Sequence, residues 1–140
     1  MRALFIGGTG TISSAIVRRL SKDKMWEVWL INRGNRADTV PENVHQIVCD
    51  INDEDAVLKA LEGMTFDVVG EFIGFTVDQV ERDFRLFKDM TKQYIYISSA
   101  SAYQKPAASY IITEGTALAN PYWVYVSTLI SGVPNSVIER

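Results

Sequence analysis

Cysteine and histidine are nearly absent from this chain of 140 residues, which contains one of each, Cys49 and His45. A single cysteine cannot form a disulfide within the chain, and one cysteine with one histidine provides too few ligands for a zinc site. Because Cys49 ends an apolar run, a buried and unreactive thiol is favoured over a reactive one. We therefore expect no metal site and no internal disulfide.

Strong charge and long apolar stretches are also missing. The formal net charge is -3, which gives no electrostatic reason to expect nucleic acid or a membrane as a partner. Glycines soon interrupt the apolar stretch at the N-terminus, so neither a signal peptide nor a membrane span fits, and we expect a cytoplasmic protein. With 47% hydrophobic residues and no repeat or low-complexity tract, one globular domain is expected.

Short apolar runs alternate with segments of helical period along the chain. The runs predict five strands, at residues 3–6, 27–31, 45–49, 67–69 and 93–97. Such alternation is typical of βαβ units on a parallel sheet. We therefore expect an α/β fold, a Rossmann-like doubly wound parallel sheet of about five strands in the order 3-2-1-4-5.

Two of the intervening helices have recognisable start signals. Thr76 and Gln79 resemble a capping box, and Asn52 is the expected N-cap of another helix that ends at Gly63. After Thr76 an apolar stripe is expected to face the core, formed by Val77, Val80, Phe84 and Phe87.

Residues 4–20 (LFIGGTGTISSAIVRRL) combine an apolar strand, a glycine turn and a helix. Gly7 can adopt the positive φ of a sharp turn, and Gly10 has no Cβ to keep a pyrophosphate away from the backbone. The following helix directs unpaired N–H groups at such an anion, whereas Ser13 replaces the third glycine of the G-x-x-G-x-x-G spacing. The alternative, a structural turn without ligand, stays open. The candidate cofactor-binding residues here are Gly7, Gly10, Thr11 and Ile12.

The second predicted strand ends in Asn32, Arg33 and Gly34, where a dinucleotide site selects its cofactor. NAD sites usually place a carboxylate there, whereas an arginine pairs with the 2′-phosphate of NADP. Asn32 and Arg33 are therefore candidate cofactor residues, NADP is favoured over NAD, and Arg36 could assist. The alternative is that both arginines are solvated loop charges.

Asp50 and Ile51 follow the third predicted strand and are further candidates for cofactor binding. A carboxylate at this end of a strand could accept a hydrogen bond from the adenine amino group. The alternative role of Asp50 is to help Asn52 and Asp53 cap the next helix.

Five segments together carry a family resemblance: GGTGTIS at 7–13, NRG at 32–34, DIND at 50–53, YISSASAY at 96–103 and NPYWVY at 120–125. With them the chain resembles the extended (atypical) short-chain dehydrogenase/reductase family, in particular its NAD-dependent epimerase/dehydratase-like members. The resemblance covers residues 1 to about 125 and only the N-terminal part of such proteins. It implies a Rossmann domain that binds NAD(P).

The resemblance also implies a catalytic serine, a tyrosine acting as general acid/base, and a lysine four residues after the tyrosine. Matching by motif places the serine at Ser99 and the tyrosine at Tyr125, but Leu129 stands at the lysine position. The lysine would lower the tyrosine pKa from about 10 and bind the nicotinamide ribose. Ser99 and Tyr125 are therefore expected to be vestigial, and the chain alone to be catalytically impaired.

Residues 126–140 depart from the long helix that the resemblance implies, because Gly132 and Pro134 would end it early. We expect residues 1–125 to form an NAD(P)-binding domain and 126–140 a divergent tail. The C-terminal substrate domain would be absent, as in a truncated member.

The preferred hypothesis is a cofactor-binding domain with little or no turnover, whose partner is a nicotinamide dinucleotide. Two alternatives stay open: an active oxidoreductase or epimerase on a nucleotide-sugar-like substrate, completed by a partner chain, and an NADP-sensing regulatory or RNA-binding module. The acidic balance argues against RNA. If the fifth strand ends the sheet, its edge should favour a homodimer or self-association.

Overall fold

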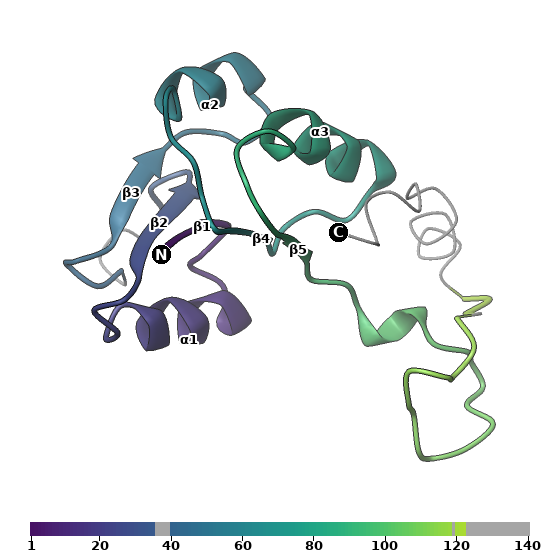
Figure 1. Cartoon of the computed structure of the whole chain (residues 1–140). Coiled ribbons are helices and arrows are strands. Elements are labelled where there is room, and N and C mark those ends of the chain that lie inside the picture. Colours follow the sequence, from purple (N-terminus) through teal and green to yellow (C-terminus); the bar gives the residue numbers. More distant parts are fainter. Residues whose placement is uncertain (36–39, 119, 123–140) are drawn as a thin grey trace. The chain divides into compact units, whose positions relative to one another are not determined.

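The computed structural model describes residues 1–35, 40–118 and 120–122, and a parallel five-stranded sheet forms its centre (Figure 1). The strands are β1 (Arg2–Ile6), β2 (Glu27–Asn32), β3 (His45–Val48), β4 (Val68–Glu71) and β5 (Tyr94–Tyr96). Their order is β3-β2-β1-β4-β5, and every neighbouring pair is parallel. The predicted fold and strand order are confirmed, although β4 begins and ends later than expected.

Helices cover both faces of this sheet, so the fold is doubly wound. The helices are α1 (Thr11–Leu20), α2 (Glu54–Ala60) and α3 (Val77–Phe87), and a short 3₁₀ helix, η2, follows at Ala100–Ala102. In Figure 1, α1 lies on one side of the strands, and α2 and α3 lie on the other. None of the helices in the described ranges is long and apolar enough to cross a membrane.

The alternation of side chains along β1 explains why two separate cores form. Leu4 and Ile6 point to the face covered by α2 and α3, where they pack with Phe66 and Phe87. Ala3 and Phe5 point to the opposite face and pack with residues of α1 such as Val17. Successive strand residues face opposite sides, so a central parallel strand must be apolar throughout, as β1 is after Arg2.

Two compact units can be distinguished, residues 1–74 with 82–97 and residues 75–81 with 98–140. The first contains the sheet with α1 and α2, and the second contains η2. The expected tail at 126–140 lies outside the described residues.

The start of α3 confirms the predicted capping box. The backbone N–H of Gln79 donates to Thr76 Oγ1 at 3.4 Å, and the N–H of Thr76 donates to Gln79 Oε1 at 3.0 Å. The predicted cap of α2 was wrong by one residue, since Asp53 accepts the N–H of Ala56 at 3.1 Å. Asn52 is unavailable as a cap because its side-chain amide donates to Asp50 and its side-chain oxygen accepts from Arg82.

The predicted core stripe of α3 is only partly correct. Val80 and Phe87 are buried, but Phe84 is 45% exposed. In place of Phe84, the helix buries Arg82 and Asp83, which are 5% and 0% exposed. The helix is thus rotated from the orientation that hydrophobicity predicts, because these two charges form ion pairs inside the unit.

Candidate functional site

The loop between β1 and α1 has the backbone geometry that the sequence predicted. Gly7 adopts a φ of +80°, and a Cβ there would overlap Cγ2 of Ile73. Gly8 is constrained differently, because a Cβ there would overlap the buried Leu30 side chain. Gly10 is the N-cap of α1 with a φ of -79°, and a Cβ there would meet only Ser13 Oγ at 3.4 Å and the Gly7 carbonyl at 3.9 Å. The protein itself therefore leaves the space over Gly10 open.

Ser13 completes this turn through its side chain. Its hydroxyl donates to the Gly7 carbonyl at 2.9 Å and accepts the N–H of Gly10 at 3.0 Å. The residue is only 1% exposed, so these bonds lie in a nearly dry environment. The serine that replaces the third glycine thus ties the two ends of the turn together.

Thr11 and Ile12 form the exposed first turn of α1. Backbone N–H groups in a first helical turn have no carbonyl four residues earlier to bond to, and they carry the positive end of the helix dipole. The first turn of α1 consequently presents backbone amide groups and contains no acidic side chain. This arrangement suits a phosphate or diphosphate.

The end of β2 forms a second part of the site. Asn32 holds the turn, because its Oδ1 accepts the N–H of Gly34 at 2.7 Å while its Nδ2 donates to Gln46 at 3.3 Å. Gly34 has a φ of +78°, and Arg33 between them is exposed. Arg36 lies outside the described residues.

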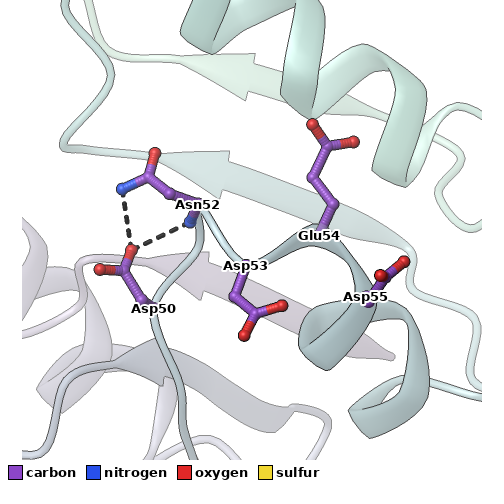
Figure 2. Close-up of a pocket in the computed structure, with 5 residues that line it drawn as sticks. All are labelled: Asp50, Asn52, Asp53, Glu54 and Asp55. Carbon is purple, nitrogen blue, oxygen red and sulfur yellow. Dashed lines mark hydrogen bonds between the residues drawn. The ribbon is translucent and has the colours of Figure 1, made fainter.

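Asp50 follows β3 and is held in a tight turn. Its Oδ1 accepts both the backbone N–H and the side-chain amide of Asn52, at 2.9 and 2.8 Å, as the dashed lines in Figure 2 show. These bonds lower the pKa of the Asp50 carboxyl, the backbone bond most, and the charges of Arg33 and Arg82 lower it further. Asp50 is therefore ionised at neutral pH. The side chain of Ile51 lies in the core, so this residue can offer only its backbone to a ligand.

A pocket of about 740 Å³ lies beside this loop, lined by Asp50, Asn52, Asp53, Glu54 and Asp55 (Figure 2). Glu54 binds Arg85 at 2.7 Å, and Asp53 caps α2. Because four of the five lining residues are carboxylates, the pocket repels phosphate, whereas the glycine turn offers amide groups that suit an anion. Among the described residues no group of side chains suits a metal ion.

Buried charges behind these loops were not predicted. Glu71, at the carboxyl end of β4, is fully buried, and Arg82 and Asp83 of α3 lie beside it. The hydroxyl of Tyr94 in β5 donates a hydrogen bond to Asp83 at 2.8 Å, and burial raises the pKa of this phenol. The sequence contained one signal of this buried charge, the carboxylate of Glu71 directly after the apolar run that ends in Gly70.

Of the predicted catalytic residues the structure describes only Ser99. Its hydroxyl accepts the N–H of Ser101 at 3.1 Å and so caps η2, which is a sufficient structural role for this serine. Ser99 belongs to the second unit. Tyr125 and Leu129 lie outside the described residues, so the catalytic assignment stays a prediction.

The sheet order and the glycine turn define a class, the Rossmann-type dinucleotide-binding domains. In these domains ligands bind outside the carboxyl ends of the strands, where the connections turn to opposite faces. That point here lies between β1 and β4. A model of the NAD-dependent epimerase/dehydratase family matches residues 3–130, and the chain belongs to this family.

Solved structures with this fold include several sugar-nucleotide epimerases. A UDP-glucose 4-epimerase superposes with a TM-score of 0.77 at 18% identity over 94% of this chain and 45% of its own. The UDP-Glc/GlcNAc 4-epimerase of Campylobacter jejuni gives 0.73 at 19% identity, over 93% and 47%. The UDP-glucuronic acid 4-epimerase of Bacillus cereus, solved with UDP-glucuronic acid and NAD, gives 0.66 at 20%, over 94% and 50%. The chain thus spans about half the length of these proteins, and no curated protein matches its sequence.

Proposed function

We propose that this chain binds a nicotinamide dinucleotide at the carboxyl ends of β1 and β2, with the diphosphate over Gly10. The observation that carries the proposal is the open space at Gly10 at the start of α1, beside a turn that Gly7 and Ser13 hold in shape. A glycine at this position lets the diphosphate approach the backbone. Membership of an NAD-dependent family supports the same ligand.

Within this site, Arg33 favours NADP over NAD. It is exposed at the end of β2, where the adenine ribose of a dinucleotide lies in Rossmann domains, and it can pair with a 2′-phosphate. Asp50 would then bind the adenine amino group, because its hydrogen bonds from Asn52 hold the pKa of its carboxyl low and keep it ionised. Thr11, Ile12, Asn32 and the backbone of Ile51 would complete the contacts.

Isothermal titration of the chain with NAD⁺ and NADP⁺ tests the site. Gly10→Ala should weaken both ligands by about tenfold or more, because its methyl group occupies the diphosphate position. Gly115→Ala is the matched control, since a Cβ there meets only Thr113 Oγ1 at 3.8 Å. No heat with either ligand from a folded chain would refute the proposal.

The same titration tests the cofactor preference. Arg33→Ala should weaken NADP⁺ by about tenfold or more, the loss expected for a charged hydrogen bond, and leave NAD⁺ nearly unchanged. Arg19→Ala removes an equal charge from the exposed surface of α1 and serves as control. If wild-type protein binds NAD⁺ more tightly than NADP⁺, the assignment of Arg33 is wrong.

For catalysis we propose that the 140-residue chain binds a dinucleotide without turning over a sugar nucleotide. Leu129 stands where the resemblance places the lysine, and no lysine or arginine occurs between Lys105 and Arg140. A Tyr125 phenol without that cation would keep its proton near neutral pH. Nicotinamide absorbance at 340 nm and product analysis with UDP-glucose check this, and epimerisation by the purified chain would contradict it.

We also propose self-association through β5. This strand ends the five-stranded order, and Ile95 at its centre is 41% exposed. Strand edges with apolar side chains pair readily with a second copy. Sedimentation velocity should show a dimer or larger species, and Ile95→Lys should reduce it, whereas a monomeric wild-type chain would refute this assignment.

A further inference from the structure

The loop after β4, residues 72–74, is held by a buried carboxyl group. Glu71 Oε1 accepts the backbone N–H groups of Ile73 and Gly74, the latter at 2.7 Å. From the other side, the Tyr96 hydroxyl donates to the Gly74 carbonyl at 2.9 Å. The loop is therefore fixed on both sides within the first unit.

This loop in turn contacts the glycine turn. The side chain of Ile73 lies so close to Gly7 that a Cβ at that position would overlap it. The backbone N–H of Phe72 donates to the Ile6 carbonyl at 3.1 Å, immediately before Gly7. A shift of the loop would therefore change the wall against which Gly7 packs.

The other oxygen of Glu71 connects the loop to the opposite side of the site. Oε2 accepts no hydrogen bond from any described residue and lies 3.7 Å from Nη2 of Arg82. Arg82 donates through Nη1 to Asn52 at 2.8 Å, and Asn52 donates to Asp50. A continuous series of contacts thus runs from Asp50, through α3, to the loop over Gly7.

We propose that Glu71 is a positioning residue for the dinucleotide: its carboxyl group holds the β4 loop against the glycine turn and links that turn, through Arg82 and Asn52, to Asp50. This inference rests on the proposed function and goes further, because it assigns a role in binding to a residue that would not touch the ligand. The two ends of the site would then be positioned together.

The charge state of the cluster provides a signature of this role. Glu71 is faced by Arg82 and Asp83 of α3 and by Tyr94 of β5. Burial, and then the neighbouring Asp83, raises the pKa of Glu71 to about 8. At pH 7 Glu71 is therefore mostly protonated, and Arg82 and Asp83 balance each other. Above pH 8 the cluster gains a negative charge behind the loop that packs on Gly7, so affinity for a diphosphate should fall.

Two substitutions of similar size separate the acceptor from the charge. Glu71→Gln keeps an oxygen that can accept the two loop N–H groups, whereas Glu71→Met fills the space without an acceptor. Titration with NAD⁺ at pH 7 should give an affinity within about twofold of wild type for the glutamine variant and about tenfold weaker for the methionine variant. Exchange of the Gly74 amide proton, followed by NMR without ligand, should be slow in wild type and in Glu71→Gln and fast in Glu71→Met.

The pH profile gives an independent result if the methionine variant fails to fold. Wild-type affinity for NAD⁺ should fall by about threefold or more between pH 7 and 9.5, and that of Glu71→Gln should stay flat. Glu62→Gln, which removes an exposed carboxylate after α2, should keep the wild-type profile. Parallel profiles for wild type and Glu71→Gln, or equal affinity in a folded Glu71→Met, would overturn the inference alone. If the wild-type chain binds neither dinucleotide, the proposed function is wrong and the inference falls with it.

Discussion

Replacing Gly7 by alanine should destabilise the protein through two separable effects. The first is backbone strain, because a residue with a Cβ at a φ of +80° costs about 1–2 kcal/mol. The second is overlap with Ile73, and overpacking of this kind typically costs about 1–3 kcal/mol. Since Ile73 is 42% exposed, it can move and relieve part of the second effect. The expected loss is about 2–4 kcal/mol, or roughly 6–13 °C in Tm for a chain of this length.

Thermal unfolding followed by circular dichroism measures this loss. Gly10→Ala is the matched variant, and its φ of -79° and open surroundings predict a change within about 0.5 kcal/mol. In the double variant Gly7→Ala with Ile73→Ala, the overlap is removed but the strain remains. Its destabilisation should therefore be smaller than the sum of the two single variants by about 1 kcal/mol. A Tm for Gly7→Ala within about 2 °C of wild type would refute the described geometry of the turn.

Four further outcomes are expected. Ser13→Ala should lower the free energy of unfolding in urea by about 1 kcal/mol, because the partly buried turn loses the serine bonds to the Gly7 carbonyl and the Gly10 N–H, which keep only their mutual bond at 3.4 Å. Phe87→Ala should cost about 3–5 kcal/mol and Phe84→Ala less than about 1 kcal/mol, and the reverse order would show that the orientation of α3 is wrong. Burial, and then the neighbouring carboxylates of Asp50 and Asp53, raises the pKa of the Cys49 thiol. At pH 8 iodoacetamide should therefore alkylate Cys49 more slowly than it alkylates the thiol of free glutathione, as mass spectrometry would measure. The pKa of the Glu71 carboxyl is about 8 in the folded chain against an ordinary value of 4.5, so as pH rises the unfolded chain loses this proton first. The free energy of unfolding should therefore fall as pH rises from about 4.5 to about 8. Chemical unfolding of Glu71→Gln over the same pH range should not show this decrease.

The sheet and its order were predictable because their signals are local. Each strand is a short apolar run between turn residues, and the alternation of strands with helical segments leaves few topologies open. The positive φ of Gly7 was predicted for the same reason, since a sharp turn between strand and helix requires it. By contrast, the constraint on Gly8 comes from Leu30 on a neighbouring strand, and no local pattern contains that information.

The orientation of α3 shows where pattern reasoning fails. Hydrophobic periodicity treats charged residues as solvent-facing, so it placed Phe84 inside and could not place Arg82 and Asp83 there. These charges are buried because they pair with each other at 2.7 Å, while Arg82 also bonds to Asn52 and Asp83 to Tyr94, which lie in other segments of the chain. Their role depends on contacts between residues far apart in the chain, and a single sequence does not show such contacts. The same limit applies to Ser99, whose motif predicts its position but not whether it acts in catalysis.

Different constraints act on the three glycines of the loop between β1 and α1, which are Gly7, Gly8 and Gly10. At Gly7 and Gly8 a larger residue conflicts with the folded protein itself, whereas at Gly10 the protein offers room for one. Natural selection for folding alone would therefore keep the first two in any descendant, with or without a cofactor. In a lineage that no longer bound the dinucleotide, other residues would be tolerated at position 10. The residue found at position 10 in related sequences can thus serve as a record of whether each of them still uses its ligand.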